Sequence, residues 1–101
     1  MKPKMVLIVD DEPDICQVVG EILRDEGLLI ETAENANVAR DKYNKHSPDL
    51  VIVDIWMPDT DGITLLKEWR ARENPPPVVM ISGHGTVETA VESVRAGAYD
   101  F

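Results

Sequence analysis

The sequence of 101 residues contains one cysteine and no uncharged apolar run that approaches the roughly 20 residues of a membrane-spanning helix. A lone cysteine excludes an internal disulfide, and the place of Cys16 on the apolar side of a predicted helix favours a small buried side chain over a reactive thiol. Lys2 and Lys4 lead into a short apolar strand, not into the longer apolar stretch of a secretory signal. These absences predict one cytoplasmic domain that crosses no membrane.

Basic residues are also scarce, with ten Lys and Arg against nineteen Asp and Glu, for a formal net charge of -9. A strongly negative chain is repelled by nucleic acid phosphates, so we expect no direct nucleic acid binding by this segment. The charge favours a cation or a basic protein surface as the partner. It also fits a role in solubility alone, and that alternative stays open.

Four apolar runs alternate with four helical segments along the chain. The predicted strands cover residues 5–9, 28–33, 50–53 and 78–81. The first predicted helix begins at Pro13 and ends before Gly27, and the second runs from about 35 to 46. The third begins after the Asp61-Gly62 turn and ends before the prolines at 75–77, and the fourth runs from 87 to a close at Gly97. Such alternation predicts an α/β fold, a doubly wound parallel sheet with helices on both faces.

All four helices have apolar residues that mark a buried side. In the second helix these residues are Ala36, Ala39 and Tyr43, and in the third helix they are Ile63, Leu65, Leu66 and Trp69. In the first helix and the last helix, respectively, these residues are Ile15, Val18, Val19, Ile22 and Leu23, and Val87, Ala90, Val91 and Val94.

Polar side chains follow three of the strands at the point where each strand ends. Asp10 and Asp11 follow the first, Asp54 the third and Ser82 the fourth. The carboxyl ends of parallel strands meet at one edge of the sheet, so these side chains are predicted to converge. Helix capping, with Glu12 included, or turn formation explains any one of them but not the whole set.

Converging carboxylates call for a cation or a raised pKa, because two of them about 4 Å apart repel by around 4 kcal/mol at an effective dielectric of 20. Oxygen ligands without cysteine or histidine favour Mg²⁺. A carboxylate beside Mg²⁺ is also a candidate nucleophile for phosphoryl transfer, which makes Asp54 the candidate acceptor. Ser82 could then donate a hydrogen bond to a phosphoryl oxygen, with Gly83 and Gly85 allowing close approach of the backbone.

Four stretches carry a resemblance to a known family: "LIVDDEPD", "DLVIVDIWMPDTDGITLL", "VVMISGHGT" and "AVESVRAGAYDF". Together they resemble the response-regulator receiver domain, the CheY-like phosphoacceptor module of two-component signalling. The resemblance implies a flavodoxin-like sheet of strand order 2-1-3-4-5. Residues 82–101 are similar to receivers of NtrC-type transcriptional activators.

The resemblance implies a role for each acid. Asp54 is expected to accept a phosphoryl group from a sensor histidine kinase. Asp10 and Asp11 are expected to hold Mg²⁺, Asp11 directly and Asp10 through water, together with Asp54 and the backbone carbonyl of Trp56. Such a chain receives a phosphoryl group and slowly hydrolyses it, so it is a switch and not an enzyme that turns over an external substrate.

The remaining family positions concern the switch and its lifetime. Ser82 and Phe101 match the switch hydroxyl and the switch aromatic residue, and the output is expected at the surface of helix four and strand five. Trp56 and His84 match positions that tune hydrolysis of the aspartyl phosphate, although a solvated loop histidine is an equal alternative for His84. An output domain that regulates transcription, with an ATPase and a DNA-binding region, is suggested by the NtrC-like wording.

One family element lies beyond the sequence: a lysine three residues past the aromatic switch position, since every lysine here precedes Ser82. We therefore expect residues 1–101 to form one receiver domain that stops before the end of strand five and helix five. Without that lysine, which pairs with the phosphoryl oxygens in the family, residues 1–101 are expected to be phosphorylated poorly. Strand four would be an edge with unpaired backbone groups, which predicts lower stability and association as a homodimer or by segment exchange.

Two other functions fit parts of the pattern. An aspartyl-phosphate type phosphatase of small phosphate esters would use a nucleophile and a general acid two residues apart, a spacing that Asp10 and Glu12 have, although Pro13 and the third-strand acid argue against it. A flavin-binding module of the same fold would need a phosphate-binding loop after the first strand, and none is present.

Overall fold

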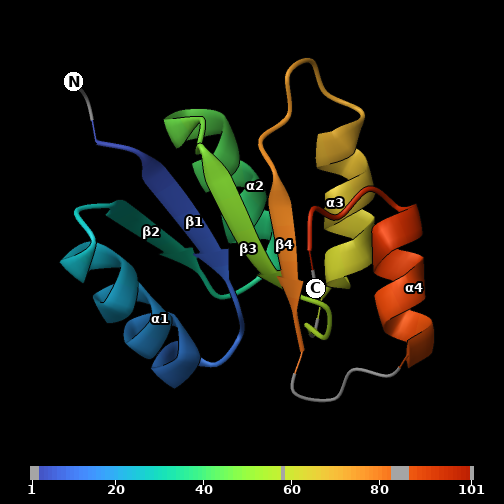
Figure 1. Cartoon of the computed structure of the whole chain (residues 1–101), viewed down its shortest axis with the longest axis horizontal. Helices are drawn as coiled ribbons and strands as arrows, with labels where there is room; N and C mark the ends of the chain where they lie inside the picture. Colours follow the sequence, from blue (N-terminus) through green and yellow to red (C-terminus); the bar gives the residue numbers. More distant parts are fainter. Residues whose placement is uncertain (1–2, 58, 83–86, 101) are drawn as a thin grey trace.

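A parallel sheet of four strands forms the centre of the molecule (Figure 1). The computed structural model describes residues 3–57, 59–82 and 87–100, and of residues 87–90 only the backbone. The strand order is β2-β1-β3-β4, which confirms the predicted doubly wound α/β class and the expected order of the first four strands, 2-1-3-4. The elements are β1 (Met5–Val9), α1 (Pro13–Asp25), β2 (Leu29–Ala33), α2 (Ala36–His46), β3 (Leu50–Asp54), α3 (Gly62–Arg70), β4 (Val78–Ile81) and α4 (Val87–Arg95).

The predicted boundaries are close to the observed ones because local chemistry fixes them. Pro13 is the first residue of α1, and Gly27 follows that helix at φ 84°, a conformation that glycine adopts without strain. Asn35 caps α2 by accepting from the Val38 N–H, and β2 begins one residue later than predicted. Among the described residues, no helix is both long enough and apolar enough to cross a bilayer.

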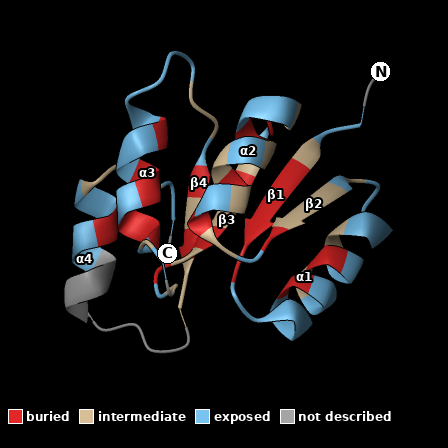
Figure 2. Cartoon of the chain, turned by 180° about the vertical axis from the view of Figure 1, so that it is seen from behind, coloured by how far each residue is buried: buried red, intermediate tan, exposed pale blue. Residues whose placement is uncertain are grey.

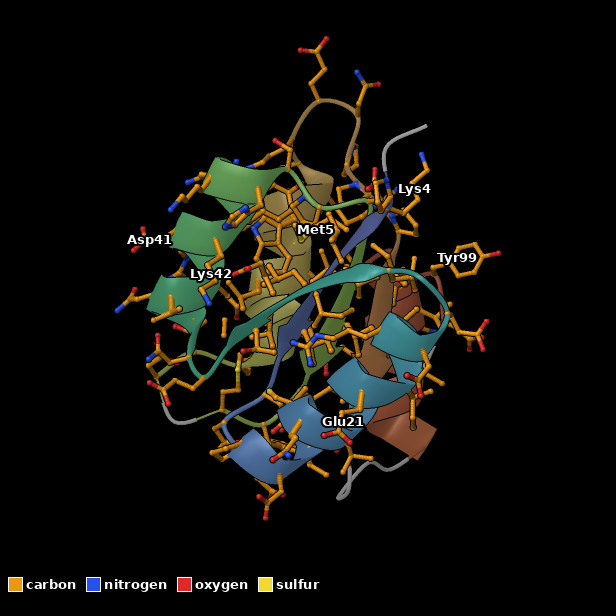
Figure 3. The ribbon with its side chains drawn as sticks, turned by 90° about the vertical axis from the view of Figure 1, so that its left-hand side faces the viewer. Lys4, Met5, Glu21, Asp41, Lys42 and Tyr99 are labelled. Carbon is orange, nitrogen blue, oxygen red and sulfur yellow. The ribbon has the colours of Figure 1, made fainter. Side chains whose placement is uncertain are left out.

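The outer side of β4 is not the unpaired edge that the sequence predicted. Met80 N–H donates to the carbonyl of Asp100 at 2.9 Å, and Tyr99 N–H donates to Val78 at 2.8 Å. The segment of Tyr99 and Asp100 therefore lies beside β4, in the place expected for strand five (Figure 1). The Tyr99 side chain is 78% exposed and points away from the body (Figure 3).

Side chains of the strands alternate between two cores. Leu7 and Val9 of β1 face the larger core, which contains residues of α2 and α3, whereas Val6 and Ile8 face the smaller core under α1. All four are at most 2% exposed, and β1 is the strand most fully enclosed by its neighbours (Figure 2). The burial of β1 on both faces explains its uninterrupted apolar run.

The predicted buried side of α1 is only half right. Val19 and Leu23 pack against the smaller core, but Ile15, Val18 and Ile22 are 37%, 56% and 59% exposed. The side of the helix that meets the sheet is centred on the buried Cys16 and Gly20 instead. Small residues there let the helix approach the sheet closely, so the larger side chains next to them stay at the surface. The buried thiol of Cys16 confirms the sequence prediction.

The predicted buried side of α4 is wrong where it can be compared. Val91 and Val94 are 43% and 59% exposed, whereas Ser93 is fully buried. Val87 and Ala90 side chains lie outside the described residues. Ala96 packs against the larger core just past the helix, and Gly97, at φ 105°, lies against Arg70 of α3. Among the side chains described from Val91 onward, small residues thus contact the body at the end of α4 and just past it.

Candidate acidic metal site

Three carboxylates from two neighbouring strands meet at the carboxyl edge of the sheet. Val9 of β1 and Val53 of β3 are paired in register. Asp10, which follows β1, and Asp54, the last residue of β3, therefore lie side by side at the edge of the sheet. One ligand oxygen each of Asp10, Asp11 and Asp54 lies within 4.8 Å of the others. The strand ends therefore converge as the sequence predicted.

The acids line a cavity of about 400 Å³ together with a residue at the end of β4. Ser82 is half-buried there, and the half-exposed side chain of Trp56 forms part of the rim. His84 and Phe101 lie outside the described residues. The lining residues are Asp10, Asp11, Glu12, Ile15, Asp54, Trp56, Ile81 and Ser82.

A second cavity, of about 450 Å³, lies on another side of Asp10, between α1, β2 and α2. Its lining mixes the cations Arg24 and Lys42 with the acids Asp10 and Glu34. Charges of both signs in one cavity do not create the demand for a cation that the three converging carboxylates create. The cavity with Asp54 is therefore the candidate site, although it is the smaller one.

Asp10 is the most enclosed of the three acids, only 4% exposed. Burial raises its pKa to about 6, the N–H of Glu12 opposes that shift, and the negative charges of Asp54, Asp11 and Glu12 add to it. The pKa of Asp54 is raised as well, first by burial and then by the charges of Asp11 and Glu12, against the N–H of Trp56. Both directions mean that the site resists holding all its negative charge alone.

Helix capping does not account for the cluster. Glu12 is the N-cap residue of α1, but its side chain makes no capping hydrogen bond. Asp10 Oδ1 accepts from the Glu12 N–H at 2.9 Å, and Asp54 Oδ1 accepts from the Trp56 N–H at 3.3 Å. These two local bonds use one oxygen each and leave the other carboxylate oxygens available to a ligand.

The donor set fits a hard divalent ion. All three ligands are carboxylates, and oxygens around one Mg²⁺ at about 2.1 Å lie roughly 3 to 4 Å apart. The observed spacing of up to 4.8 Å is close to that requirement, so a small inward movement of the side chains satisfies it. A bound cation would also offset the burial and the repulsion that raise the pKa values of Asp10 and Asp54.

The backbone that presents Asp54 is held by a glycine. A Cβ atom at Gly62 would overlap the carbonyl oxygen of Asp54 and would lie 2.8 Å from Cγ1 of Val53. The Gly62 N–H donates to the carbonyl of Ile55 at 2.8 Å, and Ile55 N–H donates to Ile81 at 3.1 Å. The sequence marked Gly62 only as a turn residue, and the contact with Asp54 depends on packing that no local signal reveals.

Comparison with known proteins identifies the family. The family model of the response regulator receiver domain matches residues 6–101. The chain is 47% identical over 98 residues to the nitrogen assimilation regulatory protein NtrX of Azorhizobium caulinodans. This match covers 95% of this chain and 22% of that protein. It is 40% identical over 97 residues to the chemotaxis protein CheY of Bacillus subtilis, and that match covers 95% of this chain and 81% of CheY.

A solved structure leads to the same family. The receiver domain of NtrX from Brucella abortus matches with a TM-score of 0.88 and 49% identity, over 95% of this chain and 82% of that one. The chain spans about a fifth of the length of the NtrX protein that it matches. The fold, the acid cluster at its carboxyl edge and the match over residues 6–101 agree, and the chain belongs to the family of response regulator receiver domains of two-component signalling.

Proposed function

We propose that Asp54 accepts a phosphoryl group from a sensor histidine kinase and that this reaction requires Mg²⁺. The observation that carries the proposal is the meeting of Asp10, Asp11 and Asp54 within 4.8 Å at the edge of one cavity. Asp54 ends β3 at the centre of that edge, where a phosphoryl donor can reach it from solvent. Membership in the receiver family supports the same assignment.

In the proposed reaction, a carboxylate oxygen of Asp54 attacks phosphorus, and the bond between phosphorus and the imidazole nitrogen of the donor breaks. Asp10, Asp11, Asp54 and the backbone carbonyl of Trp56 would hold Mg²⁺. When bound, the ion supplies positive charge that offsets the charge on the phosphoryl oxygens. Ser82, at the end of β4 and in the same cavity, would donate its hydroxyl to a phosphoryl oxygen.

We further propose that phosphorylation changes the surface of α4 and the adjoining chain end, as in a two-state switch. Val91, Val94 and Tyr99 are exposed there and offer apolar contact area to an output domain or to a second copy in a homodimer or a segment-exchanged oligomer. Phe101 and His84 keep their proposed roles in switching and in tuning hydrolysis. Residues 1–101 would serve as the receiver part of a larger cytoplasmic regulator.

The NtrX relative is named as a regulatory protein of nitrogen assimilation. We propose that this chain is the receiver of a regulator of transcription, which acts through an output region with ATPase and DNA-binding parts. The net charge of -9 argues against contact of the receiver itself with DNA.

Intact-protein mass spectrometry after treatment with acetyl phosphate tests the proposal. Wild type is expected to gain one phosphoryl group when Mg²⁺ is present and none in EDTA, and the Asp54→Asn variant is expected to gain none in either. Equal labelling of Asp54→Asn and wild type would refute the assignment of Asp54. Turnover of a generic phosphate ester by Asp54→Asn would instead indicate a phosphatase.

A further inference from the structure

Asp59 joins two loops at the acidic edge of the sheet. It lies in the segment between β3 and α3, and its two carboxylate oxygens lie 3.2 and 3.1 Å from the N–H donor of Ala36, the first residue of α2. Asp59 Oδ1 also accepts from the Thr60 N–H at 2.9 Å. The contact connects residues 23 positions apart in the sequence, so it fixes one loop relative to another element.

Asp59 is an ionised anchor. Slight burial raises its pKa, but the backbone N–H donors of Ala36, Thr60 and Asn37 lower it by more, so the net shift is downward. An anionic group at the first turn of a helix is also stabilised by the helix dipole. Asp59 thus differs from Asp10 and Asp54, which are destabilised as anions.

The bond from Ala36 to Asp59 completes a connection between the acids of the site. Asp10 N–H donates to the carbonyl of Ala33 at 3.0 Å, and Ala33 and Ala36 are the ends of the short segment between β2 and α2. That segment is therefore bonded to Asp10 at one end and to the loop that follows Asp54 at the other. The loops that carry Asp10 and Asp54 are held together through it, in addition to the pairing of β1 with β3.

Among the described residues in the middle of the loop after Asp54, no second hydrogen bond gives such support. Of the described residues between 56 and 60, Asp59 alone has a hydrogen bond to a different element, since Trp56 and Thr60 donate only to carboxylates of their own segment. Gly62 and Asp61 fix the far end of the loop, at the start of α3. Without Asp59 the stretch that contains Trp56 would be held by its two ends and by the packing of Met57 against the larger core, with no hydrogen bond from its described residues to another element.

We propose that Asp59 is a positioning residue for the metal-dependent phosphorylation of Asp54. It keeps Trp56 and Asp54 facing Asp10 and Asp11, so that the protein oxygens around the cation are in place before the ion binds. Such preorganisation lowers the cost of binding, and loss of an indirect support of this kind lowers metal affinity. The inference rests on the proposed function of the acidic site.

The test is a Mg²⁺ titration followed by tryptophan fluorescence, because Trp56 lines the acidic cavity and the other tryptophan, Trp69, is fully buried in the core. Asp59→Ala is expected to weaken Mg²⁺ binding about tenfold, the lower end of the loss that removal of an outer support causes. The rate of labelling by acetyl phosphate should fall by the same factor at limiting Mg²⁺ and recover at saturating Mg²⁺. Asp59→Asn, which keeps one acceptor oxygen, should lie between Asp59→Ala and wild type.

Two control variants separate positioning from helix stability and from charge. Asn35→Ala removes the side-chain cap of the same helix, the 2.9 Å bond from Val38 N–H, but leaves the bond to the loop. Asp41→Asn removes one negative charge from α2 at a side chain that points away from the body (Figure 3). Both are expected to bind Mg²⁺ like wild type, and thermal unfolding followed by circular dichroism checks that every variant is folded.

Wild-type Mg²⁺ affinity in Asp59→Ala would overturn the inference, and so would an equal loss in Asn35→Ala. A wild-type protein that binds Mg²⁺ but takes no label would refute the proposed function instead. The titration still decides the role of Asp59 in that case.

Discussion

Replacing Asp10 by asparagine is expected to stabilise the metal-free protein at neutral and alkaline pH. Asp10 is 4% exposed and its pKa is about 6, against an ordinary value of 3.8. A difference of about two pKa units corresponds to roughly 3 kcal/mol between the charged and neutral forms. Asparagine removes the charge and keeps an oxygen that can accept from the Glu12 N–H, so we expect a gain of about 1 to 3 kcal/mol.

The gain should depend on pH with a definite sign. Because the folded-state pKa of Asp10 lies above its unfolded value, protonation favours the folded state. That contribution is fully present below pH 3.8 and is lost as the pH rises through about 6. The variant should therefore match wild type near pH 4 and exceed it above pH 6.

Urea unfolding in EDTA, at several pH values, measures the difference. For a domain of this size each 1 kcal/mol also raises Tm by about 4 to 8 °C, so melting curves give an independent check. A variant that is no more stable than wild type at pH 8 would refute the argument that the enclosed negative charge of Asp10 destabilises the metal-free protein. A gain of the same size at pH 4 and pH 8 would contradict the role of ionisation.

Three further predictions follow from the same contacts. Gly62→Ala places a Cβ atom against the Asp54 carbonyl, so the free energy of unfolding in urea should fall by roughly 1 to 3 kcal/mol and phosphoryl labelling should slow. An unchanged labelling rate would show that the loop adapts. Mg²⁺ at 100 times its Kd should raise the free energy of unfolding by about 2.7 kcal/mol in wild type, and a similar rise in Asp54→Asn would place the ion elsewhere. Arg40 of α2 forms a bidentate pair with Glu68 of α3 at the surface, at 2.9 and 3.0 Å. Arg40→Ala should lower the free energy of unfolding by at most about 1 kcal/mol, and a larger loss in urea unfolding would mean that the pair does more than join two exposed side chains.

The sheet and the position of its acids could be predicted from the sequence because both depend on local patterns. Uninterrupted apolar runs defined β1 and β3, and a change from apolar to acidic residues marked the strand ends at Asp10 and Asp54. Parallel pairing then brings such ends together without further information. The convergence of the three carboxylates follows from these rules and required no knowledge of individual contacts.

The marked residues of α2 and α3 are buried as predicted, but the faces of α1 and α4 were predicted less well, because periodicity defines a stripe and not the part of it that meets the body. In α1 the contact is made by Cys16 and Gly20, and among the described side chains of α4, residues 91–95, the buried one is Ser93. Small residues carry a weak hydrophobic signal, although they allow the closest approach. A scan for small residues at helical spacing would have pointed to these positions.

Contacts between distant loops could not be predicted. Asp59 is one of several acids in a turn, and nothing in its local sequence indicates a bond to Ala36. The same holds for Gly62, whose place against the Asp54 carbonyl depends on the path of the whole loop. These tertiary contacts require the relative positions of two or more elements.

The central claim, that the three acids together hold one divalent cation beside the phosphoryl acceptor, is tested most directly by a crystal grown with Mn²⁺ in place of Mg²⁺. An anomalous difference map should show one peak bounded by carboxylate oxygens of Asp10, Asp11 and Asp54, and no peak there in crystals of Asp54→Asn grown at limiting metal. A map without a peak among these three side chains, or with the ion bound at another acidic cluster, would contradict the account.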